Sequence, residues 1–170
     1  MDDSIRTIFK QIFTTLKYTI SEETIREKED LIQFKLERGG IFCIVSYFDN
    51  RPLCEMFFPC PYTNPNDITK LSELLKEQEF LFELQKLLTA PNLFYHFDIN
   101  EGKFSGFSVF IQLFKKVDDI QLSEFSNAIS MVVNYGLLGH SYILLKLGKN
   151  RVEEKTITEN QKNLDNPMFS

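Results

Sequence analysis

The 170-residue chain contains no tryptophan, no long apolar run and no cluster of basic residues. A membrane-spanning helix needs about 20 mostly apolar residues, so we expect no segment of this chain to cross a membrane. Lysine and arginine total 19 against 24 aspartates and glutamates, which gives a net charge of −5. The only adjacent basic pair, Lys115 and Lys116, is followed directly by two aspartates. Because phosphate backbones repel such a chain, the composition argues against nucleic acid as a partner.

Cysteine is scarce, with Cys43, Cys54 and Cys60 as the three in the chain. Cys54 and Cys60 could in principle bind a metal together with His96 and His140, but no C-x-x-C pair supports such a site. Nothing near the N-terminus has the positive charge and apolar core of a signal peptide. We therefore expect structural, reduced thiols, no bound metal and a cytoplasmic location.

The short motifs of common enzymes are missing as well. The chain has no phosphate-binding G-x-x-x-x-G-K-[ST], no G-x-G-x-x-G after a strand, no H-E-x-x-H and no G-x-S-x-G. His96 and Asp98 fall on one side of a predicted strand, and Cys54 or Ser108 could act as a nucleophile beside them. No spacing constrains that arrangement. We expect a protein that is not an enzyme and that uses no cofactor.

Phenylalanine, by contrast, is abundant, with 17 residues in the chain. Hydrophobic residues make up 43% and charged residues 25%, as in ordinary globular proteins. The length suits one compact domain. We assign residues 1–148 to a single domain. Because the chain is polar from Lys149 onward, we expect residues 149–170 to form a disordered tail.

Hydrophobic periodicity predicts the element order α-β-β-β-α-β-β-α. Helical spacing covers 4–18, 66–89 and 123–147, and the middle segment is either one helix or two helices with a bend near Glu79. Alternating residues and turn signals predict a three-stranded meander over 31–58 and a hairpin over 93–114. Strands grouped between helices are typical of an α+β fold, here an antiparallel sheet packed by amphipathic helices.

The meander can be divided into two faces by its turns. A two-residue turn at Gly39-Gly40 places Phe34 opposite Val45, and cross-strand partners point to the same side. One face then gathers apolar residues for the helices, namely Ile32, Phe34, Leu36, Cys43, Val45 and Tyr47. If Phe48 pairs with Leu53, that face also includes Cys54, Met56 and Phe58.

The opposite face of the meander is also apolar, although a solvated face should be polar. It carries Phe42, Ile44, Phe48, Leu53 and Phe57 beside Gln33, Lys35 and Glu37. These side chains indicate a second layer, a dimer contact or a partner groove, unless the last helix of the chain covers them. In the hairpin, pairing of Ile99 with Phe104 would put Leu93, Tyr95, Phe97, Ile99, Phe104 and Phe110 on one face. Both faces of the hairpin are then apolar, and the pattern does not decide which points inward.

In element order the chain resembles the YbjN family and the class I chaperones of type III secretion. The resemblance rests on the opening amphipathic helix, the meander from Leu31 to Phe58 with turns at Gly39-Gly40 and Asn50-Arg51-Pro52, the helix from Leu71 to Leu88, the hairpin from Phe94 to Phe110, and the helix from Ser123 to Leu147. It covers roughly residues 3–148. It implies a homodimeric binding protein that holds an extended partner segment on apolar surface, and it supplies no catalytic residues.

The sequence therefore predicts a non-enzymatic protein-binding module. It would hold a partner segment or a second subunit, as in a homodimer, on the sheet face of Phe42, Ile44, Phe48, Leu53 and Phe57. The alternative is a small-ligand-binding or regulatory domain with a pocket between sheet and helix.

Overall fold

A computed structural model describes residues 3–148, so the predicted tail over 149–170 lies outside the described residues. The α+β class, the antiparallel sheet and the predicted order of elements are confirmed. The helices are α1 (Asp3–Thr15), α2 (Pro65–Leu74), α3 (Gln78–Leu88) and α4 (Leu122–Lys146). The strands are β1 (Thr19–Arg26), β2 (Leu31–Arg38), β3 (Ile41–Phe48), β4 (Leu53–Pro61), β5 (Phe94–Asn100) and β6 (Lys103–Leu113). They form one sheet in the order β1-β2-β3-β4-β6-β5, with short 3₁₀ turns at Glu27–Glu29 and Val117–Asp119.

Strand β1 is one more strand than the periodicity predicts. Its sequence is mostly polar and so lacks the apolar alternation of a buried strand. The strand lies at the edge of the sheet, and one of its inward positions carries a charge. A register shift between Ile20 and Glu22 brings Glu23 opposite the buried Phe34. There the Glu23 carboxylate pairs with the side chains of Arg6 at 2.6 Å and Lys10 at 2.9 Å, both from α1. An ion pair thus stands at the position where a half-buried strand usually has an apolar residue, so the sequence pattern does not indicate a strand here.

The middle helical segment divides into α2 and α3 at residues 75–77, as one of the two alternatives had it. Helix α2 begins slightly earlier than residue 66, the start that the spacing predicts. Pro65 occupies the first turn, where its missing N–H costs nothing, so the cap moves to the residue before it. The Asn64 side chain accepts a hydrogen bond from the Asn66 N–H at 2.9 Å.

The predicted register of the meander is confirmed. Phe34 pairs with Val45 and Phe48 pairs with Leu53. Gly39 and Gly40 both have positive φ, which a two-residue hairpin of this kind requires. On the helix side, rings from α1, β2 and α4 meet: Phe13 lies 5.1 Å from Phe34 and 5.9 Å from Phe125, measured between centroids.

The second hairpin pairs Ile99 with Phe104 as expected, but the predicted division of its faces is wrong. Between the pairs Asp98–Gly106 and Ile99–Phe104, strand β6 advances by one extra residue. Such a bulge shifts every later side chain to the other face. The fully buried side that faces the helices therefore carries Phe104 together with Phe107 and Val109, while Phe110 points the other way.

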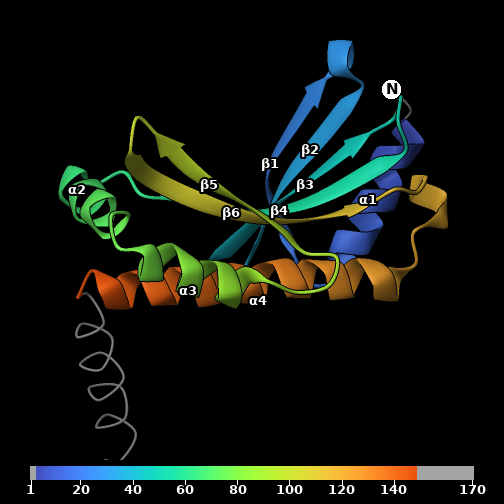
Figure 1. Ribbon diagram of the computed structural model, residues 1–170. Coiled ribbons are helices and arrows are strands. Elements are labelled where there is room, and N and C mark those ends of the chain that lie inside the picture. The colour runs from blue at the N-terminus through green and yellow to red at the C-terminus, as the bar shows by residue number, and fades with distance from the viewer. Residues whose placement is uncertain (1–2, 149–170) are drawn as a thin grey trace, which may run out of the picture.

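Helix α4 runs along β4 and β6 (Figure 1). Its glycines mark close contacts, since a Cβ on Gly136 would lie 2.2 Å from the Phe58 ring and one on Gly139 would lie 2.8 Å from Phe107. The helix has 25 residues and is apolar enough to span a membrane by length and composition alone. In this fold one side of α4, with Phe125, Ile129, Val132 and Ile143, is buried, whereas Leu138 and Leu145 on its other side are exposed.

Candidate functional site

One face of the sheet is covered and the other is not. Helices α3 and α4 lie along one side, and no helix of residues 3–148 crosses the opposite side (Figure 1). We call this opposite side the open face. Among others, it comprises Lys35, Phe42, Ile44, Phe48, Leu53, Glu55, Phe57, Phe94, His96, Asp98, Ser108, Phe110 and Gln112, as register and alternation assign them.

A row of apolar side chains crosses four strands of the open face. Ile44 pairs with Phe57, Phe57 with Phe110, and Phe110 with Phe94. The rings of Phe94 and Phe110 stack with centroids 5.5 Å apart. Phe94 is 50% exposed, and the other three are half-buried. We call these four residues the apolar row.

The five residues predicted for this surface take different positions. Ile44 and Phe57 lie together at the centre, within the apolar row. Phe48 pairs with Leu53 at one end, where Leu53 is buried and the Arg51 guanidinium lies 4.3 Å from the Phe48 ring centre. Phe42 lies at the other end, beyond the last β3–β4 pair, where its ring stacks on Phe58 of the covered side at 6.5 Å and the Lys35 ammonium lies 4.9 Å from its ring centre. The predicted surface thus has an uncovered centre and two ends that its own cations partly cover.

Sequence reasoning missed Phe94 and Phe110 as members of this surface. Their place depends on β6 pairing with β4 and on the bulge in the hairpin, both of which follow from tertiary structure. The alternation within 93–114 was the available signal, but it left both faces apolar.

Polar and acidic groups border the apolar row. A hollow of about 380 Å³ is lined by Phe57 and Phe110 from the row, by Pro59, and by Glu55, His96 and Asp98. The Gln112 side chain donates a hydrogen bond to the Glu55 carboxylate at 2.8 Å, which holds that carboxylate at the rim. The hollow therefore offers an apolar floor with two carboxylates beside it.

On the covered side, the buried side chains of Cys60 and Tyr62 form a cluster with the half-buried His140. His140 Nδ1 lies 2.9 Å from the Tyr62 hydroxyl and 3.1 Å from the Cys60 sulfur. The thiol and the hydroxyl are 3.5 Å apart. Beside the cluster, β3 and β4 separate beyond the Ile44–Phe57 pair, and an apolar hollow of about 320 Å³ opens.

This cluster is not arranged as an activated nucleophile. Burial raises the pKa of the Cys60 thiol to about 11, and burial likewise raises the pKa of the Tyr62 hydroxyl. At neutral pH both groups are protonated, whereas a reactive cysteine needs its thiolate form. The role that fits these distances is structural: the hydrogen bonds attach α4 to the end of β4.

The other residues considered for chemistry lie apart. Cys54 is fully buried on the helix side, where burial raises the pKa of its thiol, so it does not reach His96 on the open face. His96 pairs across the sheet with Ser108, and its ring nitrogen is 3.5 Å from the Asp98 carboxylate. Both His96 and Asp98 are well exposed. Among residues 3–148, no group of three or more histidine, cysteine or acidic residues could hold a metal ion.

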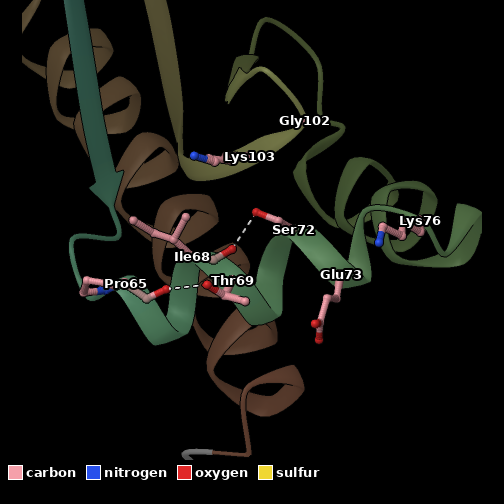
Figure 2. Close-up of a pocket in the computed structure, with 8 residues that line it drawn as sticks. All are labelled: Pro65, Ile68, Thr69, Ser72, Glu73, Lys76, Gly102 and Lys103. Carbon is pink, nitrogen blue, oxygen red and sulfur yellow. Dashed lines mark hydrogen bonds between the residues drawn. The ribbon is translucent and has the colours of Figure 1, made fainter.

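A further pocket lies beside α2 and bears on the small-ligand alternative (Figure 2). It has a volume of about 610 Å³ and is lined by α2 and the β5–β6 turn, with Ile68, Thr69, Ser72 and Lys103 among its residues. Figure 2 shows that the Thr69 and Ser72 hydroxyls donate to carbonyls of their own helix. Ser72 also accepts from the Phe104 N–H at 3.2 Å. With these hydroxyls engaged, the groups left to orient a ligand are the charged side chains at the border, Glu73, Lys76 and Lys103 (Figure 2).

Comparisons with known proteins show the fold. No family model and no curated protein matches the chain. Among solved structures, the crystal structure of an uncharacterized protein from Methanothermobacter thermautotrophicus is similar, with a TM-score of 0.68 and 12% sequence identity. The match covers 84% of this chain and 98% of that chain. At this identity the likeness concerns the fold alone.

Proposed function

We propose that this protein is a non-enzymatic binding protein that holds a segment of a partner protein on the open face of its sheet. The observation that carries the proposal is the apolar row of Ile44, Phe57, Phe110 and Phe94 on a face that no described helix covers. Aromatic side chains clustered in this way are the usual anchors of protein interfaces.

The border of the row indicates the chemistry of the segment. Glu55 and Asp98 flank the hollow over Phe57 and Phe110, and the whole chain carries a net charge of −5. A segment with large apolar side chains next to lysine or arginine would fill the hollow and neutralise its rim. Charge complementarity of this kind mainly raises the association rate and the specificity.

The proposal agrees with the function that the resemblance to YbjN proteins and secretion chaperones implies. It also needs no catalytic group, which suits protonated, buried thiols and an exposed His96. The three free cysteines fit a reducing compartment, so we place the protein in the cytoplasm.

A displayed library of random peptides tests the proposal. Panned against the purified full chain, the library should yield peptides in which a large apolar residue adjoins lysine or arginine. Their affinity, measured by fluorescence polarisation, should fall on the order of tenfold or more in the variants Phe57→Glu and Phe110→Glu, because each buries an unpaired charge at an anchor position.

The variants Phe82→Glu and Leu145→Glu are the matched controls. Both replace exposed apolar residues, 62% and 58% exposed, that lie on α3 and α4 away from the open face. They should bind the selected peptides as the parent does. Circular dichroism of each variant checks that it is folded. The proposal fails if no peptides are enriched, or if the Phe57 and control variants bind them equally.

A further inference from the structure

Strands β3 and β4 separate before β4 ends. Their pairing stops at Ile44 and Phe57, although β4 continues to Pro61. Over the same stretch β4 stays paired with β6, as far as the pair of Pro61 with Gly106. The sheet therefore has a gap on one side of β4, and the apolar hollow of about 320 Å³ lies there. We call this gap beyond the Ile44–Phe57 pair the split.

Two prolines explain the split. The Tyr62 N–H donates to the Ser105 carbonyl at 2.8 Å, so the backbone groups of Tyr62 point toward β6. Because hydrogen-bonding groups alternate along a strand, the backbone groups of Pro59 and Pro61 point toward β3. Proline has no N–H to donate. At both positions β4 thus presents a carbonyl oxygen to β3 but no donor, and the pairing of the two strands ends.

The hollow at the split has apolar walls. The apolar side chains that line it come from β3, β4 and α4, namely Ile41, Phe42, Phe58 and Leu137. The rings of Phe42 and Phe58 stack with centroids 6.5 Å apart and 17° between their planes. Cys60 and His140 also line the hollow, but their side chains lie 3.1 Å apart and contact each other. The Pro59 and Pro61 carbonyls are therefore acceptors without a paired donor on β3.

We propose that the split binds a flat aromatic molecule that carries an N–H or O–H donor, of the kind that indole represents. The ring would lie against Phe42 and Phe58, and the donor would bond to a prolyl carbonyl that β3 leaves without a partner. A hollow of about 320 Å³ is at the small end of ligand pockets, so it suits a molecule of this size.

The walls also exclude other classes of ligand. A purely aliphatic molecule would cover the prolyl carbonyls without bonding to them, and burying a polar group in this way is unfavourable. A charged molecule would lose its hydration among apolar side chains that offer no countercharge. The inference concerns a small-molecule site and goes beyond the proposed function.

Indole itself is a direct probe, because the chain has no tryptophan. The emission of indole shifts to shorter wavelength in apolar surroundings, and no tryptophan of the protein overlaps it. Titration with the full chain should show saturable binding with a dissociation constant of about 1 mM or below, as for so small a ligand. Benzofuran has the same shape with an oxygen in place of the N–H. It should compete with a dissociation constant on the order of tenfold higher, because it cannot donate to a carbonyl.

Two variants locate the binding. Leu137→Phe should fill the hollow and weaken indole binding on the order of tenfold, because the added volume takes the place of the ligand. Leu138→Phe is the matched control, since Leu138 is the next residue of α4, is 45% exposed and does not line the hollow. It should bind indole as the parent does.

Pro59→Val tests the cause of the split. Valine restores a backbone N–H directed toward β3, so pairing can continue past Phe57 and close the hollow. Indole binding should weaken on the order of tenfold while the melting temperature does not fall, because valine suits a strand. A loss of binding at unchanged stability cannot result from unfolding.

The absence of saturable indole binding overturns the inference. So does equal binding by the Leu137→Phe and Leu138→Phe variants, equal competition by benzofuran, or a Pro59→Val variant that binds indole as the parent does. No peptide enters these measurements, and no residue of the apolar row lines this hollow. Failure of the small-molecule site is thus separate from failure of the proposed function.

Discussion

Both faces of the sheet carry large apolar side chains, but helices cover only one of them (Figure 1). Phe34 on the helix side is fully buried and contacts the rings of Phe9 and Phe13, whereas Phe57 on the open face stays half-buried between Ile44 and Phe110. Both residues belong to strands with alternating apolar residues. The difference shows that alternation makes a surface apolar, but only the packing of helices makes that surface a core.

The same substitution on each face is the strongest test of this difference. Phe34→Ala should lower the free energy of unfolding by about 3–5 kcal/mol, because it leaves a cavity among packed rings. Phe57→Ala should lower it by about 1 kcal/mol, as for a partly exposed side chain. Urea unfolding followed by circular dichroism measures both values. Equal losses would mean that the open face is covered in solution.

Gly136→Ala tests how closely α4 packs on the covered face. The added Cβ would lie 2.2 Å from the Phe58 ring, so helix and strand must move apart. We expect a loss of about 1–3 kcal/mol, although alanine favours the helix. Leu138→Ala, at a 45% exposed position of the same helix, is the control for denaturant unfolding. A Gly136 variant as stable as the control would contradict close packing here.

Tyr62→Phe tests the polar contact on the covered side. The change removes the hydroxyl that lies 2.9 Å from His140 Nδ1 and leaves the Cys60 thiol as a remaining neighbour at 3.1 Å. The free energy of unfolding should fall by about 1 kcal/mol, the usual net contribution of a hydrogen bond. Peptide binding on the open face should not change. A thermal unfolding scan measures the stability, and the polarisation assay measures peptide binding. A loss of binding would mean that the cluster contributes to peptide binding.

The smallest expected effect concerns the ion pair of β1. A hydrogen bond from Arg6 and then one from Lys10 lower the pKa of Glu23, against an opposing effect of burial. Since the folded-state pKa is below the unfolded one, the stabilisation is present above the unfolded pKa and is lost as the pH falls through the folded pKa. Glu23→Gln should cost at most about 1 kcal/mol at neutral pH and almost nothing near pH 3.

Melting temperatures of the parent and the Glu23→Gln variant across this acid range check the prediction. Glu22→Gln is the control, because Glu22 lies beside Glu23 on β1 and has no such bond to α1 among the described contacts. The difference in melting temperature between the parent and the Glu23→Gln variant should disappear as the pH is lowered. A constant gap would show that the ion pair does not account for the difference.

The elements that the sequence predicted correctly are those with local signals. Gly39-Gly40 specifies its hairpin because glycine accepts positive φ, and the meander register follows from that turn. Strand β1 was missed because its inward position holds Glu23, whose partners lie on α1. The hairpin faces were wrong because one extra residue near Ser105 reverses the alternation; the neighbouring Gly106 was the local signal of this bulge, since a glycine within a strand often marks one. The proposed surface was likewise only half predicted, since Phe94 and Phe110 reach it through the β4–β6 pairing.

The sequence by itself determined the α+β class, the main strands and the presence of apolar side chains on both faces of the meander. These properties depend on spacing and on turns, which act over a few residues. Only the tertiary structure decided which face the helices cover, which strands lie at the edges, and that Cys60 meets His140. Each depends on contacts between residues far apart in the chain, and these form where packing places them.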